Sequence, residues 1–339
     1  MRYLLLMIVV LTLSASEPSS YRIAMAAPFT QPNAYACGPA SSKMLLDYWG
    51  PTVAYSDVAN VVRLTSNGTA VGDIIRAGHF SRLSAAQGKT GAIPPLTGYP
   101  DRPMGLAVLA HAQATSWLPE VKALIRQNIP VLMLMQFSAI SAGGHYRIAM
   151  GYDDAAKIMW FADPWGRELK GERDAQGFQP FSYSDIEICW TYTGYGTAIP
   201  HWGAIYVPWN VAISTSRNKN DLVVQAITTY PCPAPFNAAQ FPASQTVSTI
   251  SVPNGWSIKG APTFSVGALS AGKQAISTWN VVPGAFPAMI QVISEGRVSG
   301  SLPATGPYDG TAGEGQIYPA YSYSDIIGGA ATLTLGTNG

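Results

Sequence analysis

Residues 31–50 read QPNAYACGPASSKMLLDYWG, and the cysteine at position 37 decides how this chain is interpreted. Apolar side chains recur after it at helical spacing, at Ala40, Met44, Leu45 and Tyr48. This pattern predicts a helix that begins near Cys37, with Pro39 tolerated in the first turn, where no backbone N–H is required. A cysteine at a helix N-terminus lies where backbone N–H groups and the positive end of the helix dipole stabilise a thiolate. Cys37 is therefore a candidate nucleophile, with a buried structural thiol as the common alternative.

Gln31 is the second candidate in this stretch. It precedes Cys37 by a short loop, which can bring its side-chain amide to the same point. A nucleophile beside an amide donor is the arrangement that stabilises the oxyanion of an acyl transfer. The stretch resembles the first helix of papain-superfamily cysteine peptidases, above all the family that includes the bacteriocin-processing, double-glycine-leader peptidases, with their Gln…Cys-Gly-Pro start. The resemblance implies a papain-like α+β domain over about residues 25–212, with Cys37 as nucleophile and Gln31 in the oxyanion hole.

His145 is the candidate general base. Residues 143–152 read GGHYRIAMGY, an alternation of polarity that predicts a strand. Tyr146 and Ile148 would then point to one face, while His145 and Arg147 point to the less apolar face, where a cleft can lie. The chain has 4 histidines, and the remaining three are interpreted as surface or packed residues: His79, His111 and His201.

Asp163 is the candidate that orients this histidine. A polar turn and a second apolar run follow the first strand, and the run ends in Asp-Pro-Trp-Gly at 163–166. If Tyr152 pairs with Ile158 across the turn, Asp163 becomes a diagonal neighbour of His145, about 7–8 Å away at the backbone. A slip of one residue would put the two side chains on opposite faces. The resemblance supports the assignment, because the family carries its histidine and its orienting aspartate on two such strands.

Composition indicates an exported enzyme rather than a nucleic-acid-binding protein. Residues 1–16 begin with Met-Arg-Tyr, continue with an apolar run and end in Ser-Ala-Ser, which is the pattern of a secretory signal peptide. We therefore expect a secreted or cell-surface protein, with an uncleaved anchor as the alternative. The charges balance, with 20 Lys+Arg against 19 Asp+Glu, so we expect no nucleic-acid partner. No Cys/His spacing is typical of a metal site, so we expect neither a metal nor a cofactor.

The composition and the hydrophobic pattern of the chain change after residue 213. We expect a signal peptide over 1–16, a papain-like cysteine peptidase domain over 22–213, a polar linker over 214–221 and a β-sandwich over 222–339. β-branched runs separated by Pro, Gly and Asn predict the sandwich, which resembles the immunoglobulin-like accessory modules of secreted hydrolases. The expected fold class is thus α+β followed by an all-β immunoglobulin-like sandwich, and we expect the sandwich to be separable from catalysis.

Two features leave alternatives open. Cys189 and Cys232 could form a disulfide, which would leave Cys37 reduced, or both could be buried thiols. The pentapeptide SYSDI occurs at 182–186 and again at 322–326, but its flanks do not match. We interpret the second occurrence as coincidence rather than as a repeat.

The sequence thus predicts a secreted cysteine peptidase that hydrolyses peptide or related amide bonds. The resemblance implies an acyl-enzyme on Cys37, with His145 as general base and acid, Asp163 orienting it and Gln31 stabilising the oxyanion. Two alternatives remain: a catalytically inactive cell-surface binding or adhesion protein on the same scaffold, and a cell-wall amidase or transferase with the same triad. The expected partners are a peptide or protein substrate and, for the C-terminal domain, a cell-surface polymer or another protein.

Overall fold

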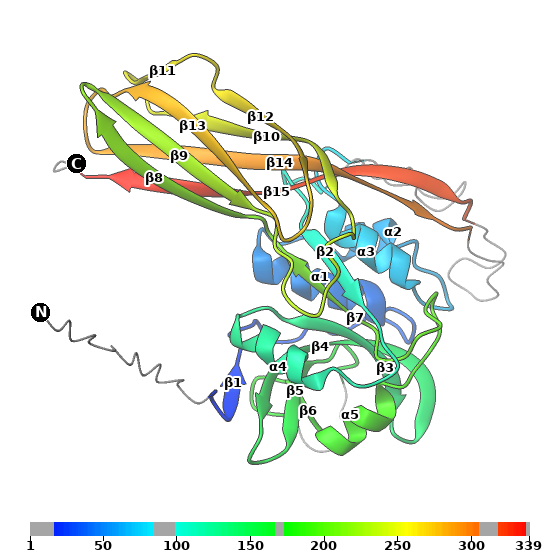
Figure 1. Ribbon diagram of the computed structural model, residues 1–339. Helices are drawn as coiled ribbons and strands as arrows, with labels where there is room; N and C mark the ends of the chain where they lie inside the picture. The colour runs from blue at the N-terminus through cyan, green and yellow to red at the C-terminus, as the bar shows by residue number, and fades with distance from the viewer. Residues whose placement is uncertain (1–16, 85–98, 167–172, 305–317, 337–339) are drawn as a thin grey trace, which may run out of the picture.

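The computed structural model describes residues 17–84, 99–166, 173–304 and 318–336. The predicted signal peptide, 1–16, lies outside the described residues. The N-terminal part combines helices with one sheet, and the C-terminal part is a β-sandwich that lies against it (Figure 1).

The N-terminal part is built on one antiparallel sheet. Its strand order is β2-β7-β3-β4-β5-β6, and β1 pairs with the end of β4. The strands are β1 (Ser20–Arg22), β2 (Ala107–His111), β3 (Val131–Ser138), β4 (Ser141–Asp153), β5 (Ile158–Ala162), β6 (Gln179–Ser182) and β7 (Gly203–Val207). The helices are α1 (Cys37–Trp49), α2 (Tyr55–Val61), α3 (Val71–His79), α4 (Leu118–Arg126) and α5 (Tyr183–Cys189). The predicted first helix is confirmed, and it begins at Cys37 itself.

Helix α1 is buried along most of its length and lies against β4. Its first two turns read CGPASS, and these small residues let the helix backbone approach its neighbours closely. A Cβ atom added to Gly38 would come within 2.9 Å of the Thr69 Cβ and 3.1 Å of the Ile74 Cδ1. The helix that carries Cys37 is therefore fixed between the sheet and the segment that leads into α3.

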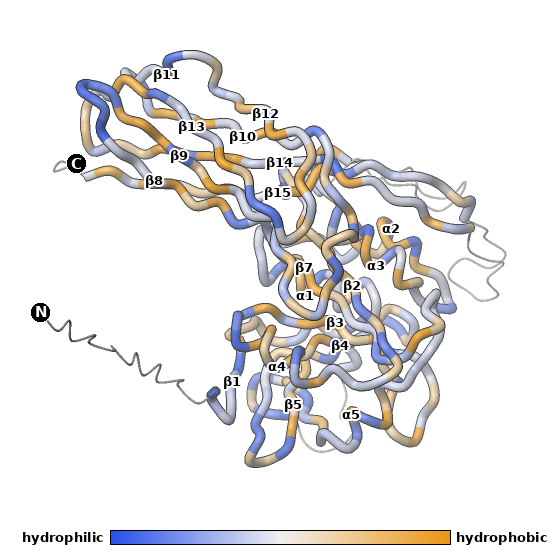
Figure 2. Tube along the Cα trace, in the orientation of Figure 1, coloured by the Kyte–Doolittle hydropathy of each residue, from blue (hydrophilic) through white to orange (hydrophobic). Residues whose placement is uncertain are grey.

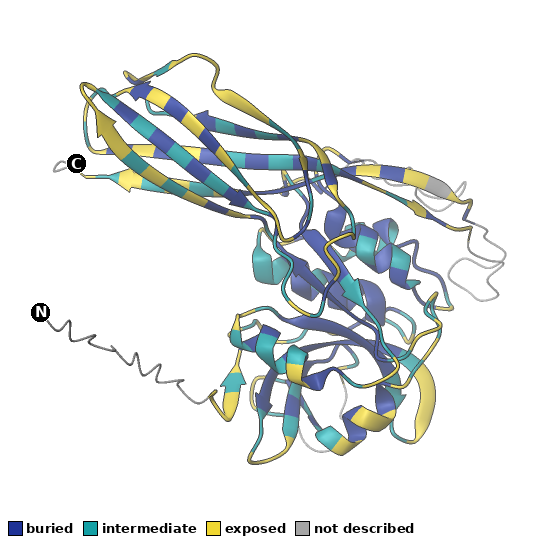
Figure 3. Cartoon of the chain, viewed as in Figure 1, coloured by how far each residue is buried: buried dark blue, intermediate teal, exposed yellow. Residues whose placement is uncertain are grey.

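The C-terminal part consists of two four-stranded antiparallel sheets, with orders β12-β10-β14-β15 and β11-β13-β9-β8. The strands are β8 (Asn210–Asn218), β9 (Asp221–Thr229), β10 (Ala243–Ser251), β11 (Ser257–Lys259), β12 (Thr263–Leu269), β13 (Gln274–Val282), β14 (Ala288–Leu302) and β15 (Tyr321–Leu335). Apolar and polar residues alternate along them (Figure 2), and so does burial (Figure 3). The inward residues, which include Val224, Trp279 and Ile290, form a core between the sheets. The predicted sandwich architecture is therefore present.

The expected linker over 214–221 is not a linker. Residues 210–218 form β8, which pairs with β9 along its whole length, and only the turn into β9 follows. The sandwich therefore begins at Asn210, inside the stretch 22–213 that we assigned to the peptidase domain. The polar composition has a simple cause, because β8 is an edge strand and most of its residues are exposed.

A second difference concerns β14. A glycine separates the apolar runs 288–295 and 297–302 in the sequence, but the two runs form one strand through Gly296. A Cβ atom on Gly296 would come within 2.8 Å of the Trp209 Cη2 and 2.7 Å of the Thr246 Oγ1. The glycine therefore serves close packing inside the strand rather than a turn.

The three cysteines of the chain all lie among the described residues, and no disulfide joins Cys189 to Cys232. Both belong to the packed interior instead, Cys189 as a buried side chain and Cys232 as a half-buried one. Within the described ranges, none of the helices has the length and apolar character needed to cross a membrane.

The close packing of α1 is testable by a single methyl group. Replacing a helix glycine with alanine normally stabilises a protein by about 1 kcal/mol. At Gly38 the added methyl group would collide with Thr69, so we expect Gly38→Ala to lower the free energy of unfolding by about 1–3 kcal/mol in urea denaturation. Gly72→Ala in α3 is the matched control, because only the flexible end of Leu302 lies near, at 3.1 Å. Equal stability of the two variants would contradict this account of α1.

Candidate active site

Cys37 begins α1, at the end of the helix dipole that stabilises negative charge. Its side chain is buried, and it forms a hydrogen bond with His145 and another with the backbone N–H of Tyr146. The Ser41 hydroxyl donates to the Tyr146 carbonyl over 3.1 Å, which ties the next turn of the helix to the same point of β4. These bonds hold the thiol beside the histidine.

His145 and Asp163 meet as the hairpin prediction required. The His145 Nε2 and the Asp163 Oδ1 are 2.9 Å apart, which leaves the Nδ1 side of the ring for Cys37. The predicted register was one residue out at the turn, where Tyr152 pairs with Met159 rather than with Ile158.

A β-bulge then corrects the register before the site. β4 has one extra residue, Met150, between the pairs Gly151–Trp160 and Ala149–Phe161. From there the pairing follows the predicted register, and it ends with Ile148 opposite Ala162, next to Asp163. Gly151 is the sequence signal for this bulge, since an isolated glycine in a strand often marks one. Its missing side chain also leaves room for β1, because a Cβ there would lie 2.9 Å from the Arg22 Cγ.

Asp163 is fully buried, so its charge needs several partners. Arg147 donates from Nε to the Asp163 Oδ2 over 2.9 Å, and the Trp165 backbone N–H donates to the Oδ1 over 2.9 Å. Burial alone would raise the pKa of Asp163, but the charges of His145 and Arg147 and these hydrogen bonds hold it well below its usual range. The carboxylate is therefore ionised at neutral pH.

Arg147 is a site residue that we did not assign from the sequence. It is fully buried, its Nη2 donates to the Phe137 carbonyl over 2.8 Å, and its guanidinium lies 4.5 Å from the centre of the Phe181 ring. The signal was present, since a charged residue in a buried strand, two positions after the candidate base, needs a buried partner.

The charge on Asp163 raises the pKa of His145, and His145 in turn lowers the pKa of Cys37. Burial alone would lower the pKa of His145, but the charge and hydrogen bond of Asp163, helped by Cys37, raise it above its ordinary value. Burial alone would raise the pKa of Cys37, but the hydrogen bond and charge of His145 and the bond from Tyr146 outweigh it and lower that pKa. Both directions favour a thiolate–imidazolium pair.

Two aromatic side chains enclose the histidine. The ring centres of Phe137 and His145 are 5.2 Å apart, those of Phe137 and Trp165 are 4.7 Å apart, and all contacts are edge-to-face. These rings place apolar surface around His145, beside its hydrogen bond to Asp163. The apolar surface lowers the local dielectric constant, and this strengthens the His145–Asp163 bond. The sequence showed Trp165 two positions after Asp163, but it gave no reason to connect Phe137 with the site.

Gln31 is buried on the loop before α1, and its backbone N–H donates to the Pro164 carbonyl over 2.8 Å. Its side-chain Nε2 donates to the Asn33 carbonyl over 2.6 Å, which occupies one of the two amide hydrogens. Its Oε1 is buried without a hydrogen-bond partner among the described residues. The structure thus ties Gln31 to the segment that follows Asp163, with one amide hydrogen not used by that bond.

The other histidines are packed residues, as expected. The His79 Nδ1 lies 3.3 Å from the Tyr323 hydroxyl, the His111 Nε2 lies 3.1 Å from the Gln113 Oε1, and the His201 Nδ1 lies 3.0 Å from the Gln113 carbonyl. Burial lowers the pKa of His79 to about 3, so this ring is neutral.

A groove of about 460 Å³ opens beside His145. Its walls come from the loop before α1, the turn between α2 and α3, the β3–β4 hairpin and the segments around Trp165 and Tyr195. The lining residues are Ala34, Tyr35, Ser66, Asn67, Phe137, Ser141, Gly143, Gly144, His145, Trp165 and Tyr195. None of these lining residues is acidic, and none is basic apart from His145. The groove is therefore suited to an uncharged peptide segment that contacts aromatic side chains.

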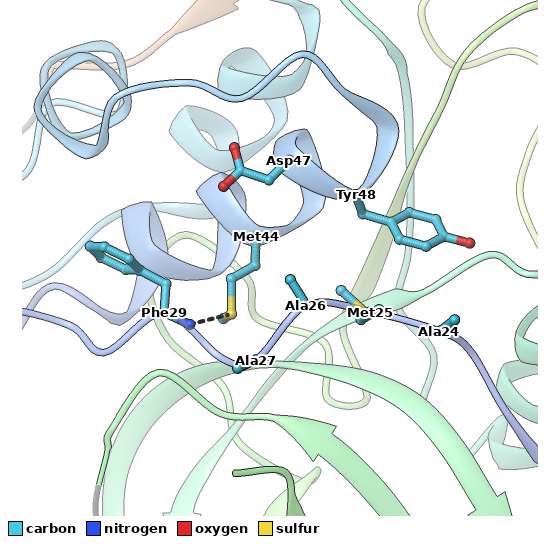
Figure 4. Close-up of a pocket in the computed structure, with 8 residues that line it drawn as sticks. All are labelled: Ala24, Met25, Ala26, Ala27, Phe29, Met44, Asp47 and Tyr48. Carbon is cyan, nitrogen blue, oxygen red and sulfur yellow. Dashed lines mark hydrogen bonds between the residues drawn. The ribbon is translucent and has the colours of Figure 1, made fainter. Parts of the chain in front are cut away.

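A second cavity, of about 260 Å³, lies between residues 24–29 and the C-terminal half of α1 (Figure 4). Met44 accepts a hydrogen bond from the Phe29 backbone N–H over 3.2 Å, and the Asp47 carboxylate is paired with Lys43 over 2.6 Å. Its walls include none of the candidate residues Gln31, Cys37, His145 and Asp163. This cavity is therefore not part of the candidate site.

A comparison with protein families gives the class of this protein. The sequence model of the Peptidase_C39 like family matches residues 24–198, and the chain belongs to this family. It is a cysteine peptidase with a papain-like domain. No curated protein matched the chain in a sequence search. Among solved structures, a double glycine motif protease from an AMS/PCAT transporter, crystallised with the leader peptide, is 14% identical over 55% of this chain and 93% of that chain, with a TM-score of 0.34.

The opposite pKa shifts of two cysteines give a direct test of the site. Cys232 is the more exposed, but burial raises its pKa, whereas the pKa of Cys37 is lowered. Because the thiolate is the reactive form, we expect iodoacetamide at pH 6 to modify Cys37 about tenfold faster than Cys232, measured by peptide mass spectrometry. His145→Ala should remove the preference. Faster modification of Cys232 in the native protein would contradict the ion pair.

Proposed function

We propose that this protein hydrolyses peptide bonds through a covalent acyl-enzyme on Cys37. The observation that carries the proposal is a single ring, His145, bonded on one side to a buried carboxylate and on the other to a cysteine at a helix N-terminus. The Cys37 thiolate adds to the carbonyl carbon of the scissile bond, and the carbonyl oxygen becomes an oxyanion. The Cys37 backbone N–H and the Gln31 amide donate to that oxygen.

His145 then moves the protons. Its imidazolium donates a proton to the leaving nitrogen, the C–N bond breaks, and the acyl group remains on the Cys37 sulfur. The neutral ring accepts a proton from water, whose oxygen attacks the thioester carbon and releases the acid and the thiolate. Asp163 keeps the ring in the orientation and tautomer that both steps need, as the carboxylate does in serine-protease triads.

Two other functions share this scaffold. An amidase or transferase would use the same residues and differ only in the acyl acceptor or the substrate, so the triad alone does not separate them. An inactive binding protein is less well supported, because it would have no use for a buried Asp163–His145 pair aimed at a thiol. Such a pair stabilises a fold weakly or not at all.

The strand topology of the C-terminal sandwich supports its assignment as an immunoglobulin-like domain. In chain order, β8, β9, β10, β11, β13, β14 and β15 take the positions of strands A to G. The sheet β8-β9-β13-β11 then corresponds to A-B-E-D, and β10-β14-β15 corresponds to C-F-G. β12 is an additional strand at the edge beside β10.

We also propose that the protein is exported, on the evidence of the signal-peptide pattern in residues 1–16. The sandwich would then act outside the cytoplasm, where its ligand is a surface polymer or another protein. N-terminal sequencing of protein collected from the culture medium tests this, and an intact N-terminus on cytoplasmic protein would oppose it.

Variants at the triad test the mechanism. With a blocked peptide–aminomethylcoumarin reporter, Cys37→Ala and His145→Ala should each abolish turnover while circular dichroism shows an intact fold, because the two residues act as one unit. Gln31→Ala should lower kcat by about 10²–10³, the usual effect of removing one oxyanion donor. Undiminished hydrolysis by Cys37→Ala would refute the proposal.

The uncharged groove sets a preference among substrates. We expect a reporter with leucine before the scissile bond to have a kcat/KM at least about tenfold above one with aspartate, because a carboxylate would lose hydration without gaining a basic partner. Asparagine is the matched control, since it has the shape of aspartate without its charge, and it should lie nearer to leucine. Equal rates for asparagine and aspartate would contradict this view of the groove.

A further inference from the structure

The hairpin of β14 and β15 reaches far beyond the sandwich core. The two strands pair continuously from Ala288–Leu335 to Leu302–Tyr321. Only the first half of β14 contributes to the core between the sheets, and the second half runs past α2 and α3 of the peptidase domain (Figure 1). The two domains are therefore in contact along this hairpin as well as at the β7–β8 connection.

The contact between the hairpin and α3 is buried and charged. The Arg76 Nε donates to the Asp325 Oδ2 over 3.0 Å, and both side chains are at most 2% exposed. The backbone N–H of Gly105 donates to the Ile326 carbonyl over 2.8 Å, close beside this pair. A buried ion pair that joins two domains resists separation, because either charge alone would be left without compensation.

A second contact joins the hairpin to the turn that follows α2. Arg63 holds Asp73 with two hydrogen bonds, from Nε over 2.5 Å and from Nη2 over 3.0 Å. Its remaining Nη1 donates to the Pro303 carbonyl, at the end of β14, over 3.1 Å. The Tyr318 ring, which precedes β15, lies 5.9 Å from the Arg63 guanidinium, and its hydroxyl donates to the Leu64 carbonyl over 3.5 Å.

The turn held in this way forms a wall of the groove. Thr65 and Gly68 pair through backbone hydrogen bonds, and the two residues between them, Ser66 and Asn67, line the groove beside His145. Thr69, which follows Gly68, accepts a hydrogen bond at its backbone carbonyl from the Tyr146 hydroxyl over 3.0 Å. The contacts therefore run without interruption from the sandwich hairpin to the substrate groove.

We propose that the β14–β15 hairpin is a positioning element of the peptidase, which holds the Ser66–Asn67 wall of the substrate groove through Arg63 and Tyr318. The inference rests on the proposed peptidase function. It replaces the expectation of a sandwich separable from catalysis, because a peptidase domain without residues 303 and 318 would lose two supports of its groove, the Pro303 carbonyl and the Tyr318 ring. Arg63 and Tyr318 act on the substrate through the wall and touch none of Cys37, His145 and Asp163 in the contacts described above.

The test is the separation of KM from kcat in the full-length protein. With the neutral leucine reporter, Tyr318→Ala should raise KM about tenfold while kcat stays within about twofold, because the wall is displaced and the triad is not. Tyr318→Phe keeps the ring against Arg63 and should restore KM to within about threefold of the native value. Ile290→Ala is the matched control, since it removes buried volume from the sandwich core and should leave KM unchanged.

A second variant covers the case in which Tyr318→Ala does not fold. Arg63→Lys keeps the positive charge, but a single ammonium group cannot bond Asp73 and the Pro303 carbonyl in the same geometry, so KM should rise as well. An unchanged KM in folded Tyr318→Ala or Arg63→Lys overturns the inference, and so does an equal rise in Ile290→Ala. Absence of hydrolysis by the native protein would instead overturn the proposed function on which it rests.

Discussion

The buried carboxylate of Asp163 is the interaction on which the site depends. A fully buried charge is stable only with several partners, and here Arg147, His145 and the Trp165 backbone N–H supply them. Removing one member of such a set leaves a buried charge uncompensated and typically costs about 3–5 kcal/mol, so Asp163 stays buried and ionised only with these partners present. β4 carries both Arg147 and His145, and the Tyr146 N–H between them bonds the Cys37 thiol. This one strand therefore supplies three of the groups that hold the site together.

The same buried position also explains how a thiol inside the protein can be reactive. Burial opposes the thiolate, and the nearby imidazolium, itself stabilised by Asp163, reverses the effect together with the hydrogen bond from Tyr146. The helix N-terminus at Cys37 adds to this field, and the edges of Phe137 and Trp165 place apolar surface around the ring. At the site, the buried charged groups lie on β4 and directly after β5, and the adjoining groove is lined by residues that carry no charge apart from His145.

The sequence allowed prediction of those parts in which local pattern and tertiary packing agree. Cys37 at a helix start and His145 on a strand facing Asp163 are of this kind. The bulge at Met150, the role of Arg147 and the continuity of β14 through Gly296 depend on neighbours far along the chain, which no local pattern shows. SYSDI makes the point most directly: at 182–186 it ends β6 and begins α5, whereas at 322–326 it lies inside β15, where Asp325 bonds Arg76.

The protonation state of His145 tests the central claim most directly. In a ¹⁵N NMR titration of the native protein, His145 should keep both ring nitrogens protonated to a higher pH than an ordinary histidine, whose pKa lies near 6.5. In Cys37→Ser, which cannot supply a thiolate, the protonated fraction should fall. A His145 ring that loses this proton at or below the ordinary pKa in the native protein would contradict the ion pair on which this account is built.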